Sequence, residues 1–181
     1  SIITTVASSV KLKKELGVLE EEDCDEAFTH IVETANYLSN TIDDFQYYFS
    51  PNKSKNNFNT KDLIDKALKL CKMDFKEKNI HIIKNVDNLK LVNFENELLQ
   101  VIINILNNAN DKLIKKDIER YIFINAYKED GNYFINIKDN AGGISEEIID
   151  RIFEPYFTTK HKSKGTGLGL AIVKEIINAH N

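Results

Sequence analysis

Five of the chain's seven glycines lie in two short groups near its C-terminal end. The first is a Gly-Gly pair at 142–143, shortly after Asp139, and the second is Gly-x-Gly-x-Gly at 165–169. Glycine suits positions where φ is positive or where the backbone approaches a ligand closely. The second group directly precedes an apolar helical pattern, and amides at a helix N-terminus bind phosphate well. The spacing therefore indicates a phosphate-binding segment.

The carboxylate of Asp139 follows a segment whose alternation predicts a β-strand. In that place it could accept a hydrogen bond from the amino group of a nucleobase, while the glycines after it leave room for a flat ligand. Aspartate between a strand and a turn is also common for structural reasons. The residue by itself leaves both explanations open.

A long predicted helix, residues 95–115, carries a polar set that could bind a metal. The set is Asn104, Asn107, Asn108, Asp111 and Lys112. Asn104 and Asn108 share one face because they are four residues apart. An amide oxygen is a hard, neutral ligand that suits a Mg²⁺ ion bound to phosphate oxygens. A solvated helix face would carry the same residues.

The segment between the two glycine groups has aromatic residues at its base and cationic residues at its tip. The tip includes Lys160, His161, Lys162 and Lys164. Long loops without secondary structure are usually functional lids or disordered segments. A cationic cluster suits a polyphosphate, although a solvated charge run is the alternative.

In combination and in this order, these features resemble the ATP-binding motifs of the sensor histidine kinases of two-component signalling. Residues 104–108 resemble the N box, 139–143 the G1 box, 151–157 the F box and 165–169 the G2 box. The resemblance covers residues 60–181. Residues 1–50 resemble the dimerisation and histidine-phosphotransfer hairpin of that family only through their heptads.

The resemblance implies ATP and Mg²⁺ as ligands. Asn108 would bind Mg²⁺, Asn104 would help to hold the metal and the phosphates, and Asp139 would recognise the adenine amino group. The implied ATP-binding set is Asn104, Asn108, Lys112, Asp139, Gly143, Ile144, Phe157, Lys160, Gly165, Thr166, Gly167, Leu168 and Gly169. Many members have Lys or Arg three residues after the metal-binding Asn. This chain has Asp111 there, followed by Lys112, and it has Ala141 where many members have glycine.

The residue at position 104 bears on the reaction. ATPases similar in fold, such as the chaperone, gyrase and mismatch-repair enzymes, carry a glutamate there as general base for water. An asparagine amide cannot take that proton at neutral pH. We therefore expect a protein-histidine kinase core, which passes the γ-phosphoryl group of ATP to a histidine and then to a response-regulator aspartate. An ATPase of the same fold, or a catalytically silent nucleotide-binding dimerisation module, is the alternative.

Other phosphate-binding motifs fit poorly. Neither a Walker-A loop nor the eukaryotic protein-kinase motifs occur in the chain,. A dinucleotide-binding fingerprint has a different glycine spacing and follows a first strand.

None of the four histidines stands in the sequence context expected of the phosphoacceptor. His30 lies in the second predicted helix, His81 in a strand, His161 in the loop and His180 near the end of the chain. We expect the acceptor to lie upstream of Ser1, so that this fragment, truncated at both ends, does not phosphorylate itself.

The N-terminal residues predict a helical hairpin. After a first helix over residues 2–16, apolar side chains follow a 3–4 spacing through Phe28, Ile31, Ala35, Leu38, Ile42, Phe45 and Phe49. Such a heptad seam is typical of helical bundles. We expect a homodimer through residues 1–50, although the seam could also pack on its own chain.

The whole chain is expected to be α+β. An α-helical hairpin that forms a dimeric four-helix bundle, residues 1–50, precedes a linker at 51–59 and a Bergerat-type two-layer α/β sandwich at 60–181. Within the sandwich we expect helices at 60–71, 95–115, 146–153 and 167–177, and strands at 80–84, 90–94, 121–127 and 133–138, the last two antiparallel.

The composition limits partners and location. The net charge of −4 disfavours nucleic acid, and no apolar run reaches the ~20 residues of a spanning helix,. The two cysteines have no disulfide or metal spacing, so we expect a cytoplasmic location, with a membrane anchor elsewhere in the full-length protein left open. A response-regulator receiver domain is the expected partner.

Overall fold

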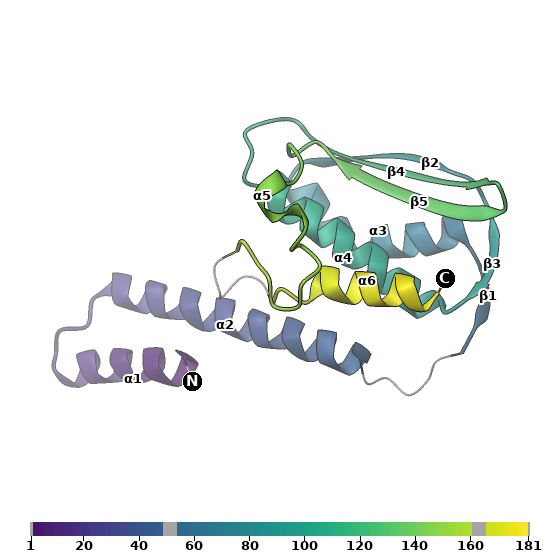
Figure 1. Ribbon diagram of the computed structural model, residues 1–181. Helices are drawn as coiled ribbons and strands as arrows, with labels where there is room; N and C mark the ends of the chain where they lie inside the picture. The colour runs from purple at the N-terminus through teal and green to yellow at the C-terminus, as the bar shows by residue number, and fades with distance from the viewer. Residues whose placement is uncertain (1, 49–53, 161–165, 181) are drawn as a thin grey trace. The chain divides into compact units, whose positions relative to one another are not determined.

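The computed structural model describes residues 2–48, 54–160 and 166–180 of the 181-residue chain (Figure 1). The chain divides into two compact units. One consists of Ser1–Ser50 with Tyr156–Leu168, and the other of Pro51–Pro155 with Gly169–Asn181.

Two helices form most of the first unit. Helix α1 (Ile2–Glu15) ends before Gly17, whose φ of 70° fits the predicted helix stop, and α2 (Glu21–Tyr48) begins with three acidic residues. Lys13 Nζ donates to Asp23 Oδ1 at 2.5 Å, and Glu20 N donates to Asp23 Oδ2 at 3.1 Å. The hydrogen bond from Lys13 lowers the pKa of Asp23, and the same bond raises the pKa of Lys13. This ion pair therefore joins the end of α1 to the start of α2.

The heptad seam of α2 lies largely open within the described part of the chain. Phe28 is 65% exposed and Leu38 is 46% exposed, and the adjacent Val32 is 56% exposed. The described structure gives no side-chain placement for the predicted seam positions Ile42, Phe45 and Phe49. Large apolar side chains on a regular stripe are typical of an interaction face.

The second unit is built on a three-stranded sheet in the order β2-β4-β5. Strand β2 (Ile80–Val86) runs parallel to β4 (Arg120–Glu129), which forms an antiparallel hairpin with β5 (Asn132–Asp139). The hairpin turn has positive φ at Asp130 and Gly131, as a type I′ turn requires,. The predicted antiparallel pair is thus confirmed.

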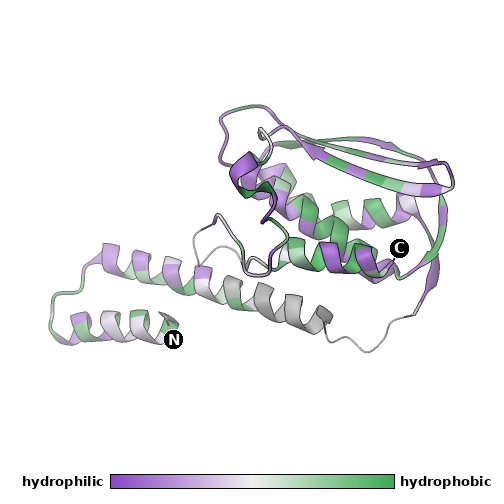
Figure 2. Ribbon diagram, in the orientation of Figure 1, coloured by the Kyte–Doolittle hydropathy of each residue, from purple (hydrophilic) through white to green (hydrophobic). Residues whose placement is uncertain are grey.

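Helices α3 (Thr60–Glu77), α4 (Glu95–Leu113) and α6 (Gly169–Ala179) lie on one side of this sheet (Figure 1). Hydrophobic and hydrophilic residues alternate along β5, so that one face of the strand meets the helices (Figure 2),. The fully buried side chains of the core are Leu63, Ile64, Ala67, Leu106, Leu113, Ile122 and Ile124. This two-layer α/β arrangement confirms the predicted fold class.

Some elements differ from the sequence prediction. Residues 56–59, assigned to the linker, form strand β1 (Asn56–Asn59), which pairs antiparallel with β3 (Lys90–Asn93). Asparagine is rare in strands, so only the pairing with β3 reveals this strand. Helix α5 (Glu146–Ile149) is shorter than predicted, although Ser145 caps it as expected by accepting from Glu147 N.

None of the described helices is long and apolar enough to cross a membrane.

Candidate functional site

Asn104 joins the polar face of α4 to the first residue of α6. Its Nδ2 donates to the carbonyl oxygen of Gly169 at 3.4 Å, and Gln100 Nε2 donates to its Oδ1 at 3.4 Å. A Cβ atom at Gly169 would lie 3.8 Å from Asn104 Cγ, in ordinary van der Waals contact. The structure therefore brings one predicted metal-site residue and one predicted phosphate-site residue side by side.

Asn108 lies one turn after Asn104 on α4 and is half-buried. No described residue makes a hydrogen bond with its amide, whereas its neighbour Asn107 is exposed. Lys112, one further turn along, is exposed and has a polar or charged contact within the chain. The amide oxygen of Asn108 is thus available to a ligand.

Asp139, the last residue of β5, is held by the turn that follows it. Its Oδ1 accepts a hydrogen bond from Ala141 N at 2.8 Å. The side chain makes no other interaction with the described residues, which leaves Oδ2 without a protein partner. One oxygen therefore fixes the carboxylate, and the other can accept a hydrogen bond from a ligand.

The neighbouring Asn140 anchors the turn to β4. Its Nδ2 donates to Glu119 O at 2.7 Å, and its Oδ1 accepts from Tyr121 N at 2.9 Å. Ala141 then enters the hydrophobic core, where it is 8% exposed. The substitution of alanine for the glycine common in the family thus places a methyl group in the core.

The glycine pair after this turn needs its backbone freedom. Gly142 and Gly143 have φ values of 99° and 80°, and a Cβ atom at either position would meet nothing within 4 Å. Side chains are disfavoured there by backbone conformation, and the space beside the glycines is open. Ile144, the next predicted site residue, is 47% exposed.

Residues Tyr156–Leu168, which include most of the G2 box, belong to the other unit, where two backbone positions close the loop. Tyr156 N donates to Gly167 O at 3.0 Å, and both residues have positive φ, 67° and 68°. A Cβ atom at Gly167 would lie 2.5 Å from the carbonyl carbon of Tyr156. Only glycine fits position 167 without a displacement of the loop backbone.

Two hydroxyl groups order the described ends of this loop. Thr158 Oγ1 accepts from Lys160 N at 3.0 Å, and Thr166 Oγ1 accepts from Leu168 N at 3.2 Å. The predicted site residue Phe157 is half-buried, as is Lys160. Three charged or near-charged residues of the loop, and one glycine, lie outside the described residues: His161, Lys162, Lys164 and Gly165.

The predicted site residues are thus divided between the two units. Asn104, Asn108, Lys112, Asp139, Gly143, Ile144 and Gly169 belong to the unit that contains the sheet. Phe157, Lys160, Thr166, Gly167 and Leu168 belong to the unit that contains α1 and α2.

The residues present fit a Mg²⁺–nucleotide. Asp139 Oδ2 offers an acceptor beside open backbone, and Asn108 offers an amide oxygen. Among the residues that the structure describes, no group of three or more His, Cys, Asp or Glu side chains could hold a metal. Mg²⁺ in nucleotide sites is commonly held by one or two protein groups together with phosphate oxygens and water.

Comparison with known proteins gives matches of the whole C-terminal half of the chain. Residues 93–181 match the family model described as histidine kinase-, DNA gyrase B-, and HSP90-like ATPase. The signal transduction histidine-protein kinase AtoS of Escherichia coli is 38% identical over 121 residues, which cover 65% of this chain and 19% of AtoS. The two-component sensor PprA of Pseudomonas aeruginosa is 42% identical over 85 residues, which cover 45% of this chain and 9% of PprA.

Among solved structures, the catalytic domain of histidine kinase ThkA superposes with a TM-score of 0.60 at 30% identity. The match covers 70% of this chain and 81% of that domain. The chain belongs to the sensor histidine kinases of two-component systems.

The N-terminal helices also have a counterpart in a histidine kinase structure. ThkA in complex with the response regulator protein TrrA superposes with a TM-score of 0.71 at 22% identity. The match covers 99% of this chain and 51% of the ThkA chain. At that identity the likeness shows the fold alone. It confirms the predicted fold, an α/β domain preceded by two helices. The chain matches only 9% of the length of PprA and 19% of the length of AtoS.

The described histidines occupy structural or exposed positions in this histidine kinase. The side chain of His30 is 54% exposed, and His81 lies 5.3 Å from the ring of Tyr121. His180 is buried between α6 and α4, where its Nε2 lies 2.5 Å from Glu97 Oε2. The Glu97–His180 pair and the Asn140 contacts were not predicted, because they join residues far apart in the sequence.

Proposed function

We propose that this chain binds Mg²⁺–ATP and forms the phosphoryl-transferring core of a sensor histidine kinase. Asp139 would accept a hydrogen bond from the adenine amino group, with Gly143 and Ile144 lining the base. Asn108 would bind Mg²⁺. The observation that carries this proposal is the carboxylate of Asp139: Ala141 N donates to one oxygen, and the other has no partner among the described residues.

The other assigned residues would hold the phosphates. Asn104 would support the metal and the phosphates from α4, with Lys112 further along the helix. Backbone amides of Gly165, Thr166, Gly167, Leu168 and Gly169 would bind the phosphates, and Phe157 and Lys160 would complete the ATP-binding set. The contact of Asn104 with Gly169 supports a shared role for these two segments.

The reaction would be transfer to histidine rather than hydrolysis. A neutral imidazole nitrogen attacks the γ-phosphorus, the bond to the β-phosphate oxygen breaks, and ADP leaves. The phosphoryl group then passes from histidine to an aspartate of a receiver domain. Asn104 supports this assignment, because its amide cannot serve as the general base that activates water. The acceptor histidine would be none of the four in this chain.

We expect this chain to bind ATP without phosphorylating itself, because none of its histidines has the expected context of an acceptor. Incubation with γ-labelled ATP and Mg²⁺ should leave the protein without acid-labile label. In the same buffer, ATP should raise the melting temperature, because a ligand of the native state stabilises it. Acid-labile label on any of the four histidines would contradict the assignment of the acceptor, and an unchanged melting temperature would favour a silent module.

We also propose a homodimer through residues 1–50, supported by the exposed seam of α2. Replacement of Phe28 with aspartate should convert the dimer to a monomer in analytical ultracentrifugation, because the charge would be buried at the seam. Asp substituted for the exposed Thr29 is the matched control and should leave the mass unchanged. A native chain that sediments as a monomer would contradict the proposal.

A further inference from the structure

An open groove of about 760 Å³ lies between helix α3 and strand β2. Its apolar surface comes from Leu68 and Phe75 of α3 and from Ile80 and Ile82 of β2. None of the residues that line it belongs to the proposed nucleotide site. The groove is therefore separate from the proposed nucleotide site.

The groove runs beside a free edge of the sheet. Strand β2 pairs with β4, and no other described strand pairs along its opposite side. Among the described residues, no backbone hydrogen bond involves the outward-facing N–H and C=O groups of Ile80–Val86. An unpaired edge can accept another strand through main-chain hydrogen bonds, and pockets beside it receive alternate side chains.

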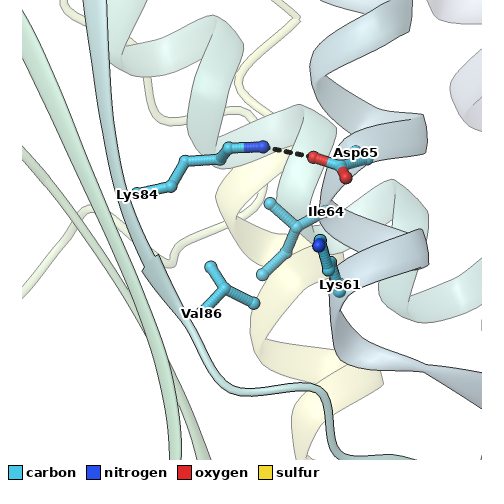
Figure 3. Close-up of a pocket in the computed structure, with 5 residues that line it drawn as sticks. All are labelled: Lys61, Ile64, Asp65, Lys84 and Val86. Atoms are coloured by element: carbon cyan, nitrogen blue, oxygen red, sulfur yellow. Dashed lines mark hydrogen bonds and ion pairs between the residues drawn. The ribbon is translucent and has the colours of Figure 1, made fainter.

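The rim of the groove is cationic. Lys69 and Lys76 are exposed on α3, and Lys84 reaches from β2 to form an ion pair with Asp65 of α3 (Figure 3). A smaller cavity of about 170 Å³ shares Lys84 and Asp65 and adds Lys61 to the lining. Four lysines therefore face one carboxylate along the two cavities.

The geometry points to an extended, acidic peptide segment of a partner protein as the occupant of this groove. Its backbone adds to the free edge of β2. The side chains on its α3-facing side alternate between apolar groups, which enter between Leu68, Phe75 and Ile82, and carboxylates, which meet Lys69 and Lys76,. A second copy of this chain is a poorer occupant, because edge-to-edge pairing of two β2 strands would bring two lysine rims together. The surface is independent of the proposed nucleotide site.

A pair of synthetic peptides tests the charge requirement. One is the octapeptide Val-Thr-Glu-Thr-Val-Thr-Glu-Thr with a fluorescent label, whose valine and glutamate side chains share one face of an extended strand. The other has lysine in place of each glutamate. Fluorescence anisotropy should show saturable binding of the acidic peptide alone. The double variant Lys69→Glu/Lys76→Glu should weaken that binding about tenfold, as expected when two surface ion pairs become repulsive. The control Lys90→Glu/Lys115→Glu makes the same charge change at exposed positions outside the groove and should have no effect.

Amide hydrogen exchange tests the added strand itself. Saturation with the acidic peptide should slow exchange of alternate amides within Ile80–Val86, and a peptide with N-methylated backbone amides should not bind. Equal binding of the basic peptide, equal loss in the control variant, or unchanged exchange in β2 would overturn the proposal. Peptide-independent dimerisation that is lost in Lys69→Glu/Lys76→Glu would assign the edge to a second copy instead.

Discussion

Replacement of Asn108 with alanine should remove the Mg²⁺-dependent part of the chain's affinity for ATP. The half-buried amide of Asn108 has no partner among the described residues, so its oxygen is available to the metal. We expect the affinity in the presence of Mg²⁺ to fall by about a hundredfold, since loss of even a supporting partner of a metal ligand typically costs 10–100-fold. Calorimetric titration with ATP, once in Mg²⁺ and once in EDTA, measures this change in affinity directly.

The control for this experiment is the adjacent Asn107, which is exposed on the same helix. Asn107→Ala changes the same side chain to the same residue and should leave the affinity unchanged. Alanine is a strong helix former, so α4 should remain folded in both variants and their circular dichroism should match that of the native chain. Unchanged Mg²⁺-dependent affinity in Asn108→Ala would refute the metal assignment.

Replacement of Gly167 with alanine should open the loop between the F box and α6 and weaken ATP binding. An alanine there would hold a left-handed conformation at a cost of about 1–2 kcal/mol. Its Cβ would also lie 2.5 Å from backbone of Tyr156, which cannot move as a flexible side chain can. The hydrogen bond from Tyr156 N to Gly167 O should break, and the amides proposed to face the phosphates should lose their arrangement.

Gly131→Ala separates backbone strain from the steric clash. Gly131 has a φ of 83° in the β4–β5 turn, but a Cβ atom there would meet nothing within 4 Å. Both variants should lower the melting temperature slightly, and Gly167→Ala alone should reduce the affinity for ATP in the same titration. Equal ATP affinity in both variants would contradict the proposed role of the loop.

The sequence predicted the elements that have strong local signals. The long apolar stripe of α4, the alternation of β4 and β5 and the Asp130-Gly131 turn each follow from short-range chemistry. Strand β1 could not be predicted, because three of its four residues are asparagines and its stability comes from the pairing with β3. Helix α6 begins at Gly169 rather than at the predicted Gly167, because the positive φ of Gly167 is incompatible with a right-handed helix.

The order of the motifs in the sequence was enough to identify the site residues, but their hydrogen bonds and packing contacts follow from the fold. The hydrogen bond from Ala141 N to Asp139 is local and typical of aspartate at a turn,. No sequence pattern indicates that Asn104 contacts Gly169, because that contact depends on how α4 and α6 pack. Likewise, His180 belongs to no motif, and its contact with Glu97 follows only from the packing of α6 against α4.

Nucleotide selectivity tests the central claim most directly, because Asp139 is proposed to recognise the amino group of adenine. At the corresponding position guanine has a carbonyl oxygen, which carries no hydrogen and cannot donate a hydrogen bond to the carboxylate of Asp139. Calorimetric titration of the native chain in Mg²⁺ should give one ATP per chain, with GTP weaker by about tenfold or more, as expected when a hydrogen bond to a charged group is lost. The variant Asp139→Asn has an amide NH₂ donor in place of one carboxylate oxygen and should lose the preference for ATP over GTP. Equal affinity for ATP and GTP, or no binding of either, would contradict the account.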